Sequence, residues 1–240
     1  MRDPMMAILF FAILAVHIFA GEAGYADISS LSKPLLLLSL IAFVILEILR
    51  GIKSAFAFLA LAGLFFSLIG DILLIFQQWG DYFVYGLGAF LTAHVFYIFA
   101  FNKTYLENHE IRLLKRYGWV SMLIVAYGFF FFNTVKDFLH EMMGPVLIYM
   151  MVISVMMMVA LNRYKKVKNS SFFWIAIGAF SFFASDSLLA WNKFVREIDY
   201  SHFLIMFTYG FAQFGIAKGA IIQIRDTSLK SIPKESEPIG

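Results

Sequence analysis

Long apolar runs, separated by short polar connections, dominate the chain. Runs of about 17 to 25 apolar residues are long enough to cross a bilayer as helices. The chain has eight of them: Pro4–Ala20, Pro34–Leu49, Ala55–Phe76, Tyr82–Phe101, Tyr117–Val135, Met143–Leu161, Ser171–Trp191 and Phe203–Ile224. The pattern predicts an all-α polytopic membrane protein with eight transmembrane helices. They form a single transmembrane domain over residues 1–224, followed by a flexible cytoplasmic tail over 225–240.

The composition indicates that lipid surrounds much of this chain. Apolar and aromatic residues make up 61% of the 240 residues and charged residues 15%, against about half and a quarter in soluble domains. The absence of Cys excludes disulfides, thiolate metal sites and a Cys nucleophile. A net charge of +3, spread over short connections, does not support a nucleic-acid partner. We expect membrane lipid as a partner, no metal and no cofactor, and the sequence does not set the oligomeric state.

The basic residues predict the orientation. Most of the 19 Lys and Arg fall in connections on the side of the two termini, and cytoplasmic connections carry the excess of positive charge. Both termini are therefore expected in the cytoplasm. The membrane is expected to be a bacterial inner membrane. The first apolar run follows only Arg2, too little positive charge for a typical signal peptide, so we interpret it as a span.

An internal repeat is suggested by two similar segments. Phe65–Leu74 and Phe180–Leu189 each place a small residue before an Asp and two Leu after it, and the two aspartates, Asp71 and Asp186, are 115 residues apart. Two prolines near the starts of the second and sixth spans are 111 residues apart, Pro34 and Pro145. The pattern predicts two parallel four-helix repeats, residues 1–101 and 117–224. The alternative is chance similarity between Phe- and Leu-rich helices.

Three carboxylates lie inside the predicted spans, where each costs about 2.5–3.5 kcal/mol at the bilayer centre. Glu47 is three residues before Arg50 near the end of its span, so we expect it to pair along the helix. Asp71 and Asp186 lie at the same depth on helices that run in the same direction, so we expect them to face each other. Two close carboxyl groups in a low-dielectric site do not easily both ionise, which provides an acid beside a base. The alternative is a structural role, with each aspartate capping a helix or bonding to a Ser or Tyr.

Other polar side chains are expected in the same layer or close to it. Tyr209 and Gln213, four residues apart, share one face of the last span. His94 lies nearer the middle of its span and is expected to orient an aspartate. The full set of candidate binding residues is Lys33, His94, Tyr97, Tyr149, Asn192, Lys193, Tyr209 and Gln213.

Five motifs in this order resemble the YhhN family, which includes the lysoplasmalogenases. They are Gly70-Asp71-x-Leu73-Leu74, Ala93-His94-x-x-Tyr97, Pro145-x-x-x-Tyr149, Ser185-Asp186-Ser187-Leu188-Leu189-x-x-Asn192-Lys193-Phe194 and Tyr209-x-x-Ala212-Gln213. The resemblance extends from about Lys33 to Gln213. Trp191 departs from the pattern, since family members more often carry a smaller or aliphatic residue there, and this bears on the shape of the pocket.

The resemblance implies hydrolysis of the vinyl-ether bond of a lysoplasmalogen, which releases a fatty aldehyde and glycerophosphoethanolamine or glycerophosphocholine. A lysophospholipid is then the expected substrate. Vinyl ethers are cleaved by acid, so Asp71 and Asp186 are the expected catalytic residues and share the roles of acid and base. Lys33 and Lys193 are the expected phosphate contacts. Tyr149, Asn192, Tyr209 and Gln213 are expected to position water and the glycerol oxygens.

Three other functions fit parts of the pattern. A proton-coupled transporter or a lipid-binding membrane protein can also use paired acids inside the membrane. However, both aspartates lie toward one face, and the spans lack the Gly and Pro interruptions of broken helices. An intramembrane aspartyl protease also uses two carboxylates, but the surroundings of Asp186 do not match that family. A metal hydrolase is disfavoured because no His, His and carboxylate set has helical spacing.

Overall fold

The computed structural model describes residues 2–51, 53–103 and 117–230, and within these ranges it contains helices and no strand. The long helices are α1 (Arg2–Glu22), α2 (Ala26–Arg50), α3 (Ala55–Ile75), α4 (Tyr82–Asn102), α6 (Gly118–Val135), α7 (Met143–Leu161), α8 (Asn169–Ala190) and α9 (Ser201–Lys230). Short 3₁₀ turns, η1 (Lys136–Phe138) and η2 (His140–Met142), join α6 to α7, and a π-helical turn, η3 (Trp191–Val195), extends α8.

The prediction of eight membrane-spanning helices is confirmed. In the described part of the chain, eight helices are long and apolar enough to cross a bilayer, and the chain is an integral membrane protein. Two predicted boundaries were wrong. The second helix begins at Ala26 rather than at Pro34, because the proline removes only one backbone hydrogen bond and the helix continues through it. The last helix continues past Ile224 to Lys230, so residues 225–230 of the predicted tail are helical. The rest of that tail, residues 231–240, lies outside the described residues.

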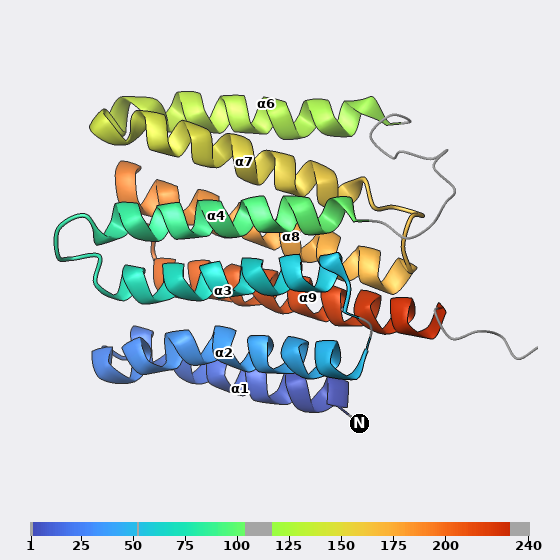
Figure 1. Cartoon of the computed structure of the whole chain (residues 1–240). Helices are drawn as coiled ribbons and strands as arrows, with labels where there is room; N and C mark the ends of the chain where they lie inside the picture. The colour runs from blue at the N-terminus through green and yellow to red at the C-terminus, as the bar shows by residue number, and fades with distance from the viewer. Residues whose placement is uncertain (1, 52, 104–116, 231–240) are drawn as a thin grey trace, which may run out of the picture.

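The helices form a bundle with two distinct ends (Figure 1). The terminal end holds the first residues of α1, the last residues of α9 and the connection between α2 and α3. The distal end, on the left of Figure 1, holds the connections α1–α2, α3–α4, α6–α7 and α8–α9. Asp71 and Asp186 each lie four residues before the end of their helix, so both are near the distal end.

Close helix pairs form the centre of the bundle, α3 with α4 and α8 with α9. A Cβ atom at Gly63 of α3 would lie 2.3 Å from the Tyr97 ring of α4. A Cβ atom at Gly178 of α8 would lie 2.8 Å from the backbone nitrogen of Ile216 of α9. Without a hydrophobic driving force between helices in lipid, small residues stabilise such pairs because they allow close backbone approach. The two pairs hold α3 and α8, which carry Asp71 and Asp186, in fixed positions in the bundle.

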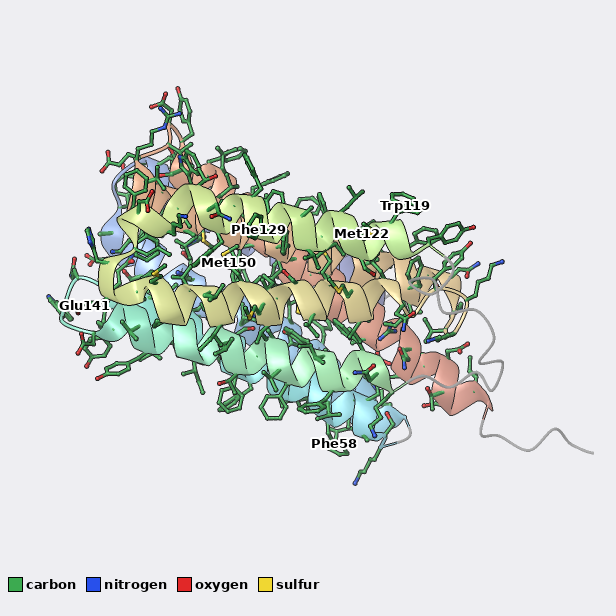
Figure 2. The ribbon with its side chains drawn as sticks, turned by 90° about the horizontal axis from the view of Figure 1, so that it is seen from above. Phe58, Trp119, Met122, Phe129, Glu141 and Met150 are labelled. Atoms are coloured by element: carbon green, nitrogen blue, oxygen red, sulfur yellow. The ribbon has the colours of Figure 1, made fainter. Side chains whose placement is uncertain are left out.

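Helix α6 lies at the edge of the bundle beside α7 (Figure 1). Only Ile124, Phe131 and Val135 of this helix are buried. Figure 2 shows Trp119, Met122 and Phe129 spaced along it, and all three side chains are exposed. Such an apolar surface matches a lipid environment.

An ion pair ties α2 to α9 at the terminal end. Arg225 donates from Nε to Glu47 Oε2 over 2.9 Å and from Nη2 to Glu47 Oε1 over 2.7 Å. Arg225 of the last helix is thus a partner of Glu47 that was not expected, and the pairing of Glu47 with Arg50 on its own helix stays a prediction. Glu47 finds its bidentate partner 178 residues away because α9 packs against α2.

Candidate active site

Asp71 lies in a sealed polar cluster between α2, α3 and α9. Its side chain is 1% exposed. The Tyr209 hydroxyl donates to Asp71 Oδ2 over 2.7 Å, and Lys33 Nζ lies 3.8 Å from Asp71 Oδ1. A buried carboxylate is tolerated when it is paired and hydrogen-bonded, and Asp71 has both kinds of partner.

A chain of hydrogen bonds extends this cluster toward α4. The Tyr97 hydroxyl donates to Gln213 Oε1 over 3.2 Å, and Gln213 Nε2 donates to the Tyr209 hydroxyl oxygen over 3.3 Å. Tyr97 and Gln213 are both fully buried. The order of donors, from Tyr97 through Gln213 and Tyr209 to Asp71, orients every hydroxyl toward the carboxylate. We call these residues, with Lys33, the Asp71 cluster.

Asp186 has a different environment. The Tyr149 hydroxyl donates to Asp186 Oδ2 over 2.6 Å. His94 Nε2 lies 4.0 Å from the same oxygen, too far for a hydrogen bond, and neither ring nitrogen of His94 has a hydrogen-bond partner among the described residues. The Asp186 side chain is 16% exposed. Unlike Asp71, it can be reached from outside.

Two phenylalanine rings connect the surroundings of the two aspartates. The Phe182 ring centroid lies 4.6 Å from that of His94 and 5.7 Å from that of Tyr209. The Phe90 ring is 5.9 Å from Tyr209 and 6.2 Å from Phe182. These edge-to-face contacts are favourable aromatic geometry. Each carboxyl group therefore has its own tyrosine, and aromatic rings pack between the two sets of partners.

An apolar pocket opens beside Asp186. Its empty volume, with the open mouth included, is about 670 Å³. Asp186, Ser187, Tyr127 and Tyr149 supply the polar groups of its wall. The apolar lining is Leu74, Phe83, Leu87, Phe90, Phe131, Val146, Met150, Ile153, Phe183, Leu189, Ala190 and Phe194. Asp71 is not among the lining residues, and Phe90 of the lining packs against Tyr209 of the Asp71 cluster.

The remaining predicted binding residues lie away from this pocket. Lys33 is turned toward Asp71, and Tyr97, Tyr209 and Gln213 belong to the Asp71 cluster. Lys193 is exposed, with Nζ 4.9 Å from the centroid of the Phe83 ring. Asn192 Oδ1 accepts a hydrogen bond from the Ile198 backbone N–H over 2.9 Å. Of the ten predicted residues, only Asp186 and Tyr149 line the pocket.

Several residues of the pocket wall were not predicted from the sequence. Phe183 lies one helical turn before Asp186 and so shares its face of α8, a spacing that was visible in the sequence. Phe90 and Phe131 carry no such signal, because one Phe among 29 is not distinctive. Tertiary packing alone selects them.

No metal site is found in the part of the chain that the structure describes, where no group of three or more His, Asp or Glu side chains is placed to hold an ion. The absence of a metal from the reaction stays a prediction.

Comparisons with known proteins give a consistent picture. The profile of the YhhN family matches residues 28–220. Lysoplasmalogenase TMEM86B of Homo sapiens is 31% identical over 155 residues, 65% of this chain and 60% of the human protein. The same protein of Sus scrofa is 29% identical over 188 residues, 78% of this chain and 72% of the pig protein. Lysoplasmalogenase of Mycobacterium tuberculosis is 30% identical over 159 residues, 65% of this chain and 58% of its own length. The chain thus matches less than two thirds of the human and mycobacterial proteins, and no solved structure matches it significantly.

Proposed function

Because the chain belongs to the YhhN family, whose matched relatives are named lysoplasmalogenases, we propose that it hydrolyses the vinyl-ether bond of alkenyl lysophospholipids. The observation that carries the proposal is the position of Asp186, a carboxyl group in the wall of an apolar pocket inside the membrane. The products are a fatty aldehyde and glycerophosphoethanolamine or glycerophosphocholine.

The pocket suits a substrate with a single apolar chain. Its lining is apolar except at Asp186, Ser187 and the two tyrosines, so an alkenyl chain can be buried while one end meets a carboxyl group. This arrangement supports a lipid rather than a polar metabolite as the ligand.

The reaction requires one proton donor and one water. In its protonated form, Asp186 donates its proton to the alkene carbon distal to the ether oxygen, and the carbon bonded to that oxygen becomes an oxocarbenium centre. The resulting Asp186 carboxylate stabilises the cation and accepts a proton as water adds to this centre. The hemiacetal then collapses: its hydroxyl loses a proton as the carbonyl forms, its C–O bond to glycerol breaks, and the glycerol oxygen gains a proton, so the aldehyde and the glycerol product leave and Asp186 is protonated again. Tyr149, which holds Asp186 Oδ2, positions the carboxyl group.

Asp71 has a second role in this proposal. It does not line the pocket and is paired with Lys33 and with Tyr209, which packs against Phe90 of the pocket wall. Asp71 therefore supports the pocket wall and the local charge balance rather than contacting the alkenyl chain. The equal division of acid and base roles between the two aspartates is the less favoured version, since it requires Asp71 to reach the pocket.

We also propose that the bundle consists of two parallel four-helix repeats. The polar partners support it, because spacings of 115 or 116 residues separate the members of three pairs: Asp71 and Asp186, His94 and Tyr209, and Lys33 and Tyr149. Asp71 is approached by Lys33 from its own half and by Tyr209 from the other half. Asp186 is approached by Tyr149 from its own half and by His94 from the other half.

The orientation in the membrane is part of the same proposal. The described basic residues at the terminal end support a cytoplasmic location for both termini. They include Arg50, Lys53, Lys103, Arg163, Lys165, Lys168 and Arg225. The pocket would then open toward the outer leaflet of an inner membrane.

Release of aldehyde by purified protein tests the function. In detergent, with no gradient across a membrane, the protein is expected to release aldehyde from an alkenyl lysophospholipid and none from the ester-linked lipid of equal chain length, because only the vinyl ether has an alkene carbon that can be protonated. Saturable binding of the alkenyl lipid without release of aldehyde would contradict the enzyme and favour a transporter or lipid-binding protein. Measuring binding of both lipids separates the two results.

A further inference from the structure

A second cavity adjoins the pocket on the other side of Phe131 and Ser187. This cavity, the α6–α8 groove, has an empty volume of about 1310 Å³ with its open mouth included. It is lined by Tyr127, Phe131, Ala184, Ser187, Leu188, Trp191, Arg196, Glu197, Ile198 and Asp199. Tyr127, Phe131 and Ser187 line the pocket as well, so the two cavities share a wall.

The charged groups of the groove are gathered at one end. Arg196, Glu197 and Asp199 follow η3 in the connection to α9, while the lining contributed by α6 and α8 is apolar or uncharged. All three side chains are exposed, and within the described ranges none of them forms an ion pair. The groove thus offers one cation and two anions at the distal end, next to an apolar interior.

The charged segment has a fixed backbone. Asn192 Oδ1 accepts from the Ile198 N–H over 2.9 Å, the Arg196 N–H donates to the Trp191 carbonyl over 3.2 Å, and the Ser201 N–H donates to the Ile198 carbonyl over 3.0 Å. These bonds hold both sides of Arg196 before any ligand arrives, which lowers the entropic cost of binding. Asn192 is therefore a positioning residue for the segment.

We propose that the α6–α8 groove binds the zwitterionic headgroup of the lysophospholipid, with the Arg196 guanidinium as the contact for its phosphate. This assignment rests on the proposed function. Arginine pairs with phosphate through two parallel hydrogen bonds, and the carboxylates of Glu197 and Asp199 lie on the same wall to receive the ammonium. With the alkenyl chain in the pocket, the glycerol crosses the shared wall beside Ser187.

The proposal replaces the earlier expectation for the phosphate contacts. Lys33 is paired with Asp71 and is largely buried, and Lys193 lies over the Phe83 ring outside both cavities. Arg196 is the cation that lines a cavity next to Asp186. Trp191, the departure from the family pattern, lines the same groove.

Equilibrium binding of lipids that cannot be cleaved tests the site without relying on catalysis. The probes are a saturated alkyl-ether lysophosphoethanolamine and the matching alkylglycerol, which has no phosphate. Arg196→Gln is expected to weaken binding of the phospholipid about tenfold and to leave alkylglycerol binding unchanged. The matched control is Lys136→Gln, since Lys136 is a distal-end cation bonded to Asn133 outside both cavities, and it should change neither affinity.

Two results would overturn the site: unchanged phospholipid affinity in Arg196→Gln, or equal loss for both probes. Inorganic phosphate should not compete at millimolar concentration, and competition would indicate an ion site rather than a headgroup site. The double variant Glu197→Gln, Asp199→Asn is expected to weaken the lysophosphoethanolamine and to spare an alkyl lysophosphatidate, which lacks the ammonium. Equal weakening of both would remove the two carboxylates from the site.

Kinetics separate this proposal from the function on which it rests. If the protein releases aldehyde, Arg196→Gln should raise KM for the alkenyl phospholipid about tenfold and keep kcat within about twofold, because headgroup binding is the same in the ground and transition states. Normal catalysis with unchanged KM in Arg196→Gln would contradict the headgroup site and leave the proposed function in place. Phosphate-selective binding without aldehyde release defeats the proposed function alone.

Discussion

Asp71 and Asp186 occupy corresponding places, each four residues before the end of its helix and each held by one tyrosine hydroxyl, yet their surroundings differ. Asp71 is 1% exposed and has a lysine partner, whereas Asp186 is 16% exposed and borders an apolar pocket. A fixed ion pair stabilises structure, while a carboxyl group in the wall of an apolar pocket can exchange a proton with a ligand. The comparison separates a supporting carboxylate from a reactive one.

The partners explain how similar positions diverge. In the proposed repeat, Lys33 beside Asp71 corresponds to Tyr149 beside Asp186. Tyr209 beside Asp71 and His94 beside Asp186 correspond in the same way. A cation in one half and a neutral group in the other give the two carboxylates different charge balance. Of the two aspartates, Asp186 alone lines the pocket, while Phe90 of the lining packs against Tyr209, the partner of Asp71.

Asp186→Asn should have the largest effect on activity. The amide cannot donate the proton, so kcat for aldehyde release is expected to fall by about 10³-fold, with the apparent unfolding temperature close to that of the unchanged protein. Asp81→Asn, an exposed carboxylate just before α4, is the matched control and should retain full activity. Activity of Asp186→Asn within tenfold of the unchanged protein would remove Asp186 from the reaction.

Asp71→Asn should have a smaller effect on activity and a larger one on stability. Lys33 loses its partner in a mostly buried position, which costs about 1–3 kcal/mol, and kcat is expected to fall about tenfold as the pocket wall loosens. The apparent unfolding temperature in detergent measures the cost. Adding Lys33→Met should recover part of the lost stability, since it removes the unpaired charge. If Asp71→Asn matches the activity loss of Asp186→Asn and remains stable, the two carboxyl groups share the chemistry.

The two tyrosines give the smallest and most discriminating test. Each Phe substitution removes one hydroxyl donor from a carboxylate, an interaction worth about 1.5–3 kcal/mol. Tyr149→Phe is expected to lower kcat three- to tenfold with little change in unfolding temperature. Tyr209→Phe is expected to lower the unfolding temperature with little change in kcat. Parallel measurements of kcat and unfolding temperature check the pair. Identical profiles for the two variants would show that the halves are equivalent.

The spans could be predicted because membrane insertion depends on local composition. Eight apolar runs suffice for eight helices, whatever their neighbours. The apolar runs did not give the helix ends, since α2 begins eight residues before Pro34 and α9 continues six residues past Ile224. Polar residues can extend a helix beyond its apolar run when partners stabilise them. Ser32 donates to the Ile28 carbonyl near the start of α2, and Arg225 pairs with Glu47 near the end of α9.

The sequence by itself determined that the chain lies in a membrane and that two aspartates within it require partners, because the length of an apolar run and the presence of a charge inside it can be recognised without the fold. Tertiary structure decided which aspartate meets a pocket. The partner of Asp71, Tyr209, is 138 residues away along the chain, and that of Asp186, Tyr149, is 37 away. Such pairs depend on how each helix is rotated and packed against its neighbours. No local pattern encodes that rotation when nearly every face of every helix is apolar.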